Sequence, residues 1–257
     1  MFISTEFTYD GIKGSDRGLY LVKTNSGMIE SSFGYKKENK IEQINDNIFS
    51  YGFDTEPLRF EITLAKIKED DLLWDYKTRR DVVEWLFQDD YKPFVSLDNP
   101  EVIYYCKLIG DAKRFDNGLM QGYITLTMEC NSPYAYSPSY IYTWDYSNCK
   151  SNIIEIENLS NVKKYYYPEI EIEMVDDTNV EIKNLSNAGE VFKIGILKQG
   201  EVIYIDNNMQ RIESNLPNTY RLGNFNKNWL RLVKGYNLLK ITGNVKISIR
   251  CCYPISI

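Results

Sequence analysis

Histidine is absent from the 257 residues. The chain therefore has no imidazole base, no histidine metal ligand and no Ser-His-Asp triad. It contains neither a GxxxxGK[ST] nor a GxGxxG nor a GxSxG motif, so nothing indicates a nucleotide site or a hydrolase nucleophile. No apolar run approaches the roughly 18 residues that span a bilayer, and the N-terminus does not resemble a secretory signal. We expect no enzymatic activity, no cofactor or metal, and no membrane association.

Acidic residues outnumber basic ones. Lys and Arg number 30 against 36 Asp and Glu, a net charge of −6, which disfavours non-specific binding of nucleic acid. The charge is also uneven. Residues 1–137 hold 16 basic and 23 acidic residues, a net of −7, whereas residues 138–257 hold 14 and 13, a net of +1.

Cysteine is sparse and does not form a recognisable site. The number is odd and no CxxC occurs, so the spacing of a zinc site is missing. The sequence favours buried or incidental thiols in a chain assembled in reducing cytosol. The cysteines are Cys106, Cys130, Cys149, Cys251 and Cys252.

The length suits two domains better than one core. Near the midpoint, residues 131–138 (NSPYAYSP) place Pro133 and Pro138 in a polar stretch that stops regular structure. This predicts a boundary at about 134–140, with domains of residues 1–137 and 138–257.

The first half predicts strands and one helix. Alternating apolar and polar residues indicate strands at 2–9, 19–23, 60–65, 94–97, 102–108 and 119–129. Thr78 followed by Asp81 resembles a capping box, and the helix should end near 89–91, before Pro93. Its predicted buried face consists of Val82, Val83, Leu86 and Phe87.

Residues 24–56 are too polar for a core and indicate a long hairpin or arm. Aromatic residues punctuate this segment, and their spacing is typical of anchors for a neighbouring surface, so we expect them to include contacts between subunits. The alternative is an ordinary hairpin packed on its own domain. These residues are Phe33, Tyr35, Phe49, Tyr51 and Phe53.

The second half is almost wholly β in pattern. Short strands are expected at 153–157, 170–174, 179–183, 191–196, 202–205, 210–213, 235–242 and 245–253, with turn signals between them. Such spacing indicates a β-sandwich.

Few polar clusters suggest chemistry. The adjacent carboxylates at 70–71, 89–90 and 176–177 point to opposite sides of an extended chain, which favours solvated charge over an acid/base couple. Residues 206–208 (DNN) lack calcium-loop spacing and favour a turn. Trp229 has polar neighbours that suit a glycan contact, although a partly buried ring under a loop is the alternative.

Nearly the whole chain carries a series of short motifs in a fixed order. The most characteristic is residues 132–136 (SPYAY). The others lie at 7–11, 18–22, 57–64, 79–87, 98–105, 122–130, 158, 167–172, 200–206 and 235–247. In this order and spacing the chain resembles the distal tail proteins of long-tailed bacteriophages that infect Gram-positive bacteria.

The resemblance implies a mainly β protein of two β-domains: an N-terminal tail-tube-like domain with one helix, and a C-terminal galectin-like β-sandwich. It implies a structural hub in the virion tail, assembled in the host cytoplasm, in which six copies form a ring. The ring would join the tail tube protein to a tail-associated lysin or tail-tip hub protein and to receptor-binding proteins.

The resemblance also implies that DNA passes through the ring without specific binding. The net −7 of residues 1–137 predicts a channel lined with more Asp and Glu than Lys and Arg. The alternative function is a glycan-binding module acting through the C-terminal sandwich. Residues 138–257 leave no room for an inserted sugar-binding module, and galectin sites use a histidine that this chain lacks.

Overall fold

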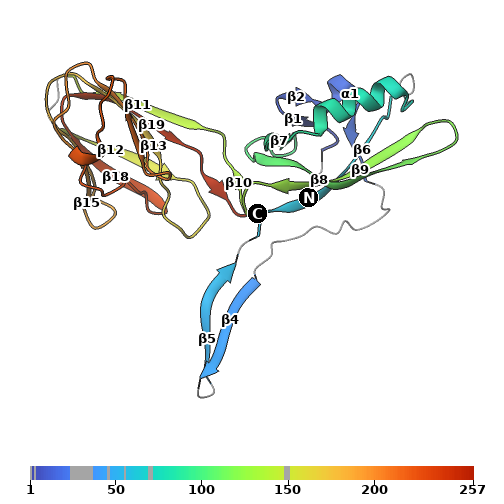
Figure 1. Cartoon of the computed structure of the whole chain (residues 1–257), viewed down its shortest axis with the longest axis horizontal. Coiled ribbons are helices and arrows are strands. Elements are labelled where there is room, and N and C mark those ends of the chain that lie inside the picture. The colour runs from blue at the N-terminus through green and yellow to red at the C-terminus, as the bar shows by residue number, and fades with distance from the viewer. Residues whose placement is uncertain are drawn as a thin grey trace. The chain divides into compact units, whose positions relative to one another are not determined.

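The computed structural model describes residues 2, 4–23, 37–44, 47–54, 56–68, 72–147 and 151–257, with the backbone alone for 37–54. The chain divides into two units, one of Met1–Ser137 with Ile255–Ile257 and one of Pro138–Pro254. Both are built from antiparallel strands (Figure 1), which confirms the predicted mainly β fold. Among the described residues there is one α-helix.

The first unit is organised around a seven-stranded sheet in the order β2-β1-β7-β8-β9-β6-β3. Asp10 and Gly11, with φ of 52° and 75°, form the two-residue turn between β1 and β2, a conformation typical of a type I′ hairpin. The strands are β1 (Phe7–Tyr9), β2 (Ile12–Lys13), β3 (Tyr20–Leu21), β6 (Arg59–Ala65), β7 (Lys92–Ser96), β8 (Tyr104–Asp116) and β9 (Gly122–Cys130).

Helix α1 (Tyr76–Leu86) lies against one face of this sheet (Figure 1). It starts before the predicted capping box, because the carboxylate of Asp75 accepts a hydrogen bond from the backbone N–H of Thr78 at 2.7 Å. Its buried face also differs from the prediction. Trp85 is buried with Val82 and Leu86 because its indole N–H reaches the carbonyl of Tyr9 at 3.0 Å. The predicted Val83 and Phe87 are 48% and 45% exposed instead.

The core between helix and sheet is aromatic. Phe7 stacks on Trp85 with ring centroids 5.9 Å apart and on Phe94 at 5.5 Å. Ile255 packs on the same core and belongs to β20 (Pro254–Ile255), which pairs with β10 (Ala135–Tyr136). The last residues of the chain therefore complete the first unit.

A separate two-stranded sheet lies between β3 and β6 in sequence. It consists of β4 (Lys37–Ile44) and β5 (Asn47–Asp54), which in the described part of the chain pair only with each other (Figure 1). The register shifts twice along this hairpin. The expected long hairpin therefore forms.

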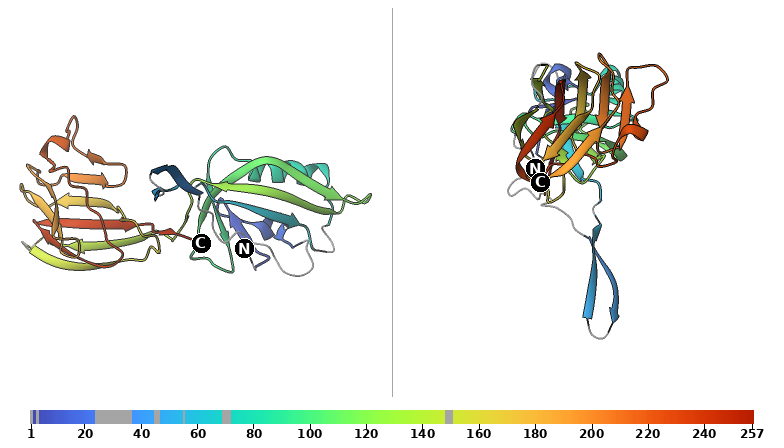
Figure 2. Two further views of the ribbon diagram at one scale, coloured as in Figure 1. Left: turned by 90° about the horizontal axis from the view of Figure 1, so that it is seen from below. Right: turned by 90° about the vertical axis from the view of Figure 1, so that its left-hand side faces the viewer.

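The second unit consists of two antiparallel sheets, in the orders β11-β19-β13-β16-β17 and β12-β18-β14-β15 (Figure 2). Strand β11 was not expected from the sequence, whereas β18 has the predicted bounds. The strands are β11 (Tyr140–Asp145), β12 (Ser151–Asn158), β13 (Glu169–Met174), β14 (Val180–Asn184), β15 (Glu190–Ile194), β16 (Val202–Asp206), β17 (Arg211–Ser214), β18 (Gly235–Thr242) and β19 (Val245–Cys251).

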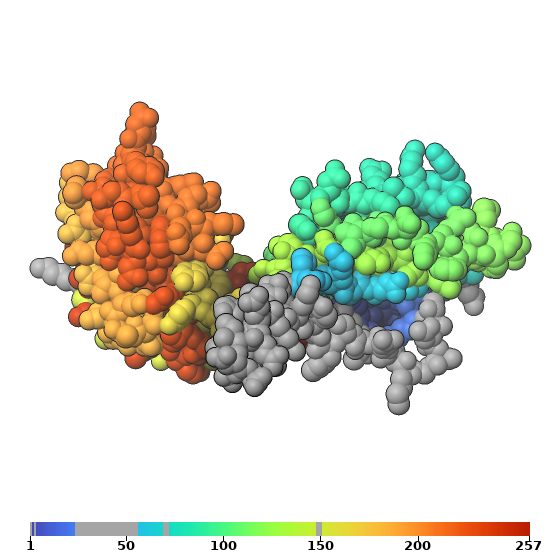
Figure 3. All heavy atoms as spheres, turned by 60° about the horizontal axis from the view of Figure 1, so that its bottom comes forward, coloured from blue at the N-terminus to red at the C-terminus, as the bar shows by residue number. Residues whose placement is uncertain are grey.

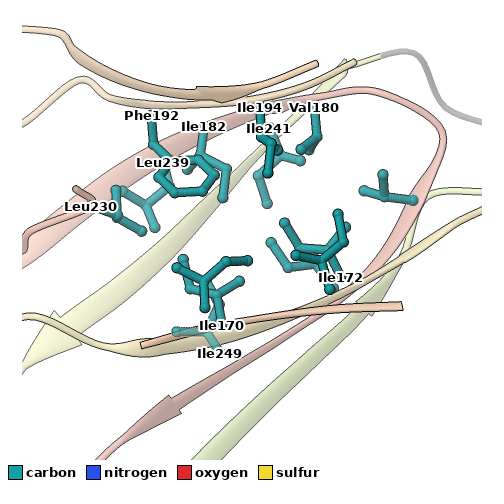
Figure 4. Packing of buried hydrophobic residues seen from close by; sticks show 14 of the residues in the cluster. Ile170, Ile172, Val180, Ile182, Phe192, Ile194, Leu230, Leu239, Ile241 and Ile249 are labelled. Atoms are coloured by element: carbon teal, nitrogen blue, oxygen red, sulfur yellow. The ribbon is translucent and has the colours of Figure 1, made fainter. Parts of the chain in front are cut away.

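Every second side chain of these strands points between the two sheets, and these side chains form the core. Ile170 and Ile172 of β13 face Ile182 of β14 and Leu239 and Ile241 of β18 across the sandwich (Figure 4). All are at most 1% exposed, and the intervening positions of β18 are exposed. This period-two burial is the physical basis of the predicted sandwich.

Candidate functional site

The β4–β5 hairpin carries part of the predicted contact set. Phe49, Tyr51 and Phe53 occupy alternate positions of β5, with Phe49 opposite Ile41 and Phe53 opposite Glu38. Phe33 and Tyr35 lie outside the described residues. Three of the five predicted aromatic residues therefore lie at alternate positions of one strand of this hairpin.

Trp229 is half-buried in the second unit and packs against its core. Its ring meets Phe225 edge-to-face with centroids 4.6 Å apart. Asn184, Glu190 and Arg231 are among the residues around it, and the recess between them is too small to hold a water molecule. The geometry combines a packed aromatic with a polar rim.

Most polar groups of this recess are already hydrogen-bonded within the chain. The Asn184 amide donates to the Arg231 carbonyl at 2.9 Å and to Asn237 at 3.0 Å. The guanidinium of Arg231 pairs with Glu190 and lies 4.3 Å from the Tyr165 ring centroid. Among the described residues, the Arg231 Nε is the buried polar side-chain atom without a hydrogen-bond partner.

The buried Asn207 fixes the loop that carries Trp229. Asn207 accepts a hydrogen bond from the Leu230 N–H at 2.9 Å and donates to the Pro168 carbonyl. Asp206 accepts from the N–H groups of Asn208 and Met209, which makes residues 206–208 the turn that the sequence favoured. The loop is therefore held by specific amide contacts as well as by apolar packing.

A buried ion pair lies at the opposite end of β16. Glu201 is 0% exposed, and both of its carboxylate oxygens accept hydrogen bonds from the Arg221 guanidinium at 2.7 Å. Ser214 and the Lys198 N–H also donate to it. Burial alone would raise the pKa of Glu201, but these hydrogen bonds outweigh it and hold the pKa below its ordinary value.

Arg221 also sets the backbone of an exposed residue. Ile196 has φ of 58°, a left-handed conformation that β-branched residues rarely adopt. Its N–H donates to the Asn179 side chain and its carbonyl accepts from Arg221 Nη1, both at 3.0 Å. The side chain is 68% exposed, and Tyr220, next to Arg221, is 76% exposed. The ion pair thus holds a strained loop that displays apolar side chains. Figure 3 shows an orange segment of the second unit that stands out from its surface.

Two family models match the chain in succession. One is described as a phage tail protein N-terminal domain and covers residues 2–132. The other is described as a phage tail C-terminal domain and covers residues 134–251. The chain belongs to the phage tail proteins. The tail protein is also 28% identical over 253 residues, 97% of either chain, to a curated SPbeta prophage-derived uncharacterized protein, YomH, of Bacillus subtilis strain 168.

Solved structures show the same fold over nearly the whole tail protein. The Dit (gp 19.1) protein of phage SPP1, titled a paradigm of the hub adsorption apparatus in phages that infect Gram-positive hosts, aligns with a TM-score of 0.66 and 16% identity. The alignment covers 96% of this chain and 98% of that one. A baseplate chain of phage P2 aligns with a TM-score of 0.51 and 10% identity, covering 95% and 97%. The resemblance to distal tail proteins is thereby confirmed.

The acidic pairs of the tail protein form no acid/base couple where they are described. Asp177 pairs with Lys198 at 2.9 Å and accepts from the Gln199 N–H, while Asp176 accepts from Asn244. Residues 70–71 lie outside the described residues. Within the described ranges no group of three or more metal-ligating side chains converges, and no helix is long and apolar enough to cross a membrane.

Sequence reasoning missed the Glu201–Arg221 pair and the strain at Ile196. The two charged residues lie twenty positions apart, and nothing in the surrounding pattern couples them. Ile196 shortly precedes the Lys198–Gly200 turn and follows the alternating residues 191–194, so the sequence predicts it as the last residue of a strand. Only the three-dimensional contacts identify these residues.

Proposed function

We propose that this tail protein is a hub in which six copies form a ring at the distal end of the tail and join the tail tube to the tail tip or baseplate. The observation that carries the proposal is the fold shared with the SPP1 hub protein over 96% of this chain. The match includes both units, so the proposal covers the first unit, which would form the ring, and the second unit as well. Such a role requires surfaces for assembly and no catalytic group.

The first unit would form the ring. The segment of residues 24–56, which includes the β4–β5 hairpin, would contribute contacts to a neighbouring subunit or to the adjoining tail ring, with its aromatic residues Phe33, Tyr35, Phe49, Tyr51 and Phe53 among them. No other described strand pairs with either edge of the hairpin, which suits strand-to-strand contacts with another chain.

The second unit would serve as the platform for a tail-associated lysin or tip hub protein and for receptor-binding proteins. Ile196 and Tyr220 are exposed apolar side chains on backbone that the Glu201–Arg221 pair fixes. Rigid, exposed aromatic and aliphatic anchors are typical of residues that dominate protein interfaces. We therefore place a partner contact on this loop.

DNA would pass through the ring without specific binding. The net −7 of residues 1–137 supports an acidic channel that repels the polyanion over a Debye length of about 8 Å. In a structure of the ring, we expect channel-facing side chains to be mostly Asp and Glu. A channel lined mainly by Lys and Arg would contradict the acidic channel but not the hub.

The hub proposal is tested by the assembly state of the full chain. Light scattering after size exclusion, with and without the tail tube protein, should reveal a species of six times 30.1 kDa. Negative-stain images of that species should show a ring. A chain that stays monomeric alone and with the tail tube protein would refute the proposal.

A second candidate function is glycan binding on the half-buried ring of Trp229, favoured by the polar side chains of Asn228 and Arg231 beside it. Stacking of a sugar on an aromatic face, with a nearby donor, is a common mode of recognition. A glycan array should then show binding that Trp229→Ala abolishes and Trp144→Ala, on β11, preserves. Equal signals from both variants would exclude the recess.

A further inference from the structure

Two of the described cysteines lie side by side on adjacent strands of the seven-stranded sheet of the first unit. Cys106 of β8 and Cys130 of β9 are direct partners in the antiparallel register. Both side chains are 0% exposed and belong to the same core cluster. The alternation of burial along β9 places Cys130 on the face that also carries Leu126 and Met128.

The hydrogen-bond pattern shows which kind of cross-strand pair they form. The Asn131 N–H donates to the Tyr105 carbonyl at 2.9 Å, so the neighbouring pair is the hydrogen-bonded one. The Cys130 N–H points to the other side and donates to the Leu58 carbonyl at 2.7 Å. Cys106 and Cys130 are therefore a non-hydrogen-bonded pair, in which Cα atoms lie about 4.5 Å apart and side chains approach closely.

That spacing is compatible with a disulfide. Bridged cysteines have Cα atoms roughly 4.4–6.8 Å apart, a range that includes the non-hydrogen-bonded position of an antiparallel pair. The sheet already holds both strands in place, so bridging requires rotation of two side chains and little movement of the backbone. Burial raises the pKa of Cys106, and the neighbouring Cys130 thiol raises it further.

We propose that Cys106 and Cys130 form a disulfide once the assembled tail leaves the reducing cytosol, and that this bridge fastens β8 to β9. The inference rests on the location in the tail and not on the number of copies in the ring. A low-molecular-weight disulfide is the oxidant. One protein thiolate attacks it and releases one small thiol, and the second protein thiolate then displaces the other. Two protein thiols lose two protons and two electrons, and one small disulfide becomes two thiols.

The reaction is slow and depends on opening of the sheet. Burial raises the pKa of Cys130 to about 12 and that of Cys106 further, so little thiolate is present at neutral pH. Oxidant reaches these thiols only when β8 and β9 separate briefly. Inside the cell the thiols stay reduced, which leaves folding and assembly free of the crosslink.

The other described cysteines provide internal controls. Cys251 lies opposite Tyr140 in the sheet of the second unit, so no described thiol faces it across the strands. Cys252 is its chain neighbour and is less buried. Cys252 should therefore react with small disulfides as a single thiol without forming the predicted bridge.

The experiment compares the full chain in oxidised glutathione at pH 8 with the same protein in a phosphine reductant. After alkylation of the free thiols, peptide mapping by mass spectrometry without reduction should find Cys106 joined to Cys130, with mixed disulfides confined to other cysteines. The midpoint of the first unit's thermal transition should rise by roughly 5–10 °C and return on reduction.

Cys106→Ala and Cys130→Ala should each abolish the linked peptide and the thermal shift, whereas Cys251→Ala should keep both. The peptide map of the unsubstituted chain decides the question even if an alanine variant folds poorly. Absence of the 106–130 peptide after Cys252 has reacted and longer incubation no longer changes the peptide map, or linkage of either cysteine to another partner, would overturn the proposal.

Discussion

Glu201 shows how a single buried carboxylate organises a whole loop of the second unit. It binds Arg221 from one side of the loop, Ser214 from β17 and the backbone of Lys198 from the preceding turn. Arg221 in turn holds the carbonyl of Ile196. The carboxylate of Glu201 therefore positions Arg221, and Arg221 holds the backbone of Ile196, which lies 25 positions before it in the sequence.

Removing that charge should be costly. Glu201→Gln leaves the Arg221 guanidinium buried without a counter-charge, so we expect the free energy of unfolding of the second unit to fall by about 3 kcal/mol. Urea denaturation followed by fluorescence measures it. Asp177→Asn is the control, because its pair with Lys198 is exposed and should contribute no measurable stability. A loss in the control as large as that in Glu201→Gln would contradict the explanation.

The same carboxylate predicts how stability depends on pH. Since the folded-state pKa of Glu201 lies below its ordinary value of 4.5, the pair's contribution is fully present above that value. It is lost as the pH falls from there through the lower folded-state pKa. Thermal melts between pH 6 and pH 3 should show a decline that is smaller in Glu201→Gln. Parallel declines in the two proteins would place the acid sensitivity elsewhere.

Ile196 should be a site where a polar residue stabilises the fold. Asparagine tolerates the left-handed conformation better than a β-branched residue, so Ile196→Asn should raise the free energy of unfolding by ~1 kcal/mol. The same change at Ile153, which is 54% exposed on the regular strand β12, should not stabilise the protein. If the loop also binds a partner as proposed, Ile196→Asn will weaken that binding while raising stability.

At the scale of elements, helix α1 and the β4–β5 hairpin differ in what holds them. The helix is anchored by Trp85, whose indole fills the core and donates to Tyr9. The hairpin has its own ladder and no described strand beside it. The first element contributes to stability, and we propose that the second makes contacts outside the unit.

Deleting residues 34–52 should separate assembly from folding. The seven-stranded sheet and helix do not include the hairpin, so the shortened chain should keep its thermal transition. It should elute as a monomer where the full chain forms a ring. Replacing Phe49, Tyr51 and Phe53 by Ser tests the aromatic contribution with the strands retained. An intact ring after the deletion would exclude the hairpin as an assembly contact.

At the scale of the whole molecule, the two units differ in how their cores close. The sandwich core uses residues of the second unit alone, whereas the core of the first unit is joined by Ile255 from the end of the chain. The first unit is therefore discontinuous in sequence, and the second is a continuous insertion within it.

A fragment of residues 138–254 should fold alone. Its two sheets bury their facing side chains against each other, so the fragment should melt cooperatively with a β-type far-UV spectrum. Its midpoint should match the transition of the second unit in the full chain. The fragment of residues 1–137, which lacks Ile255, should be less stable than the first unit of the full chain. An unfolded spectrum for 138–254 would contradict the independence of the sandwich.

The sequence alone determined the mainly β architecture, most strand positions of the second unit, the hairpin and the tail-protein resemblance. The alternation of apolar and polar residues in strands, and the turn residues between strands, are local features of the sequence. They can therefore be recognised without knowledge of the fold. The missed strand β11 has Tyr140, Tyr142 and Trp144 at its inward positions, with Ile141 exposed between them, so the alternation was weak.

The tertiary structure decided the rest. Trp85 replaced Val83 and Phe87 on the buried face of the helix because a distant carbonyl, that of Tyr9, satisfies its indole. The strained Ile196, the Glu201–Arg221 pair and the facing Cys106 and Cys130 depend on strand register and loop paths. Register is set by the packing of whole sheets, so no short stretch of sequence contains it.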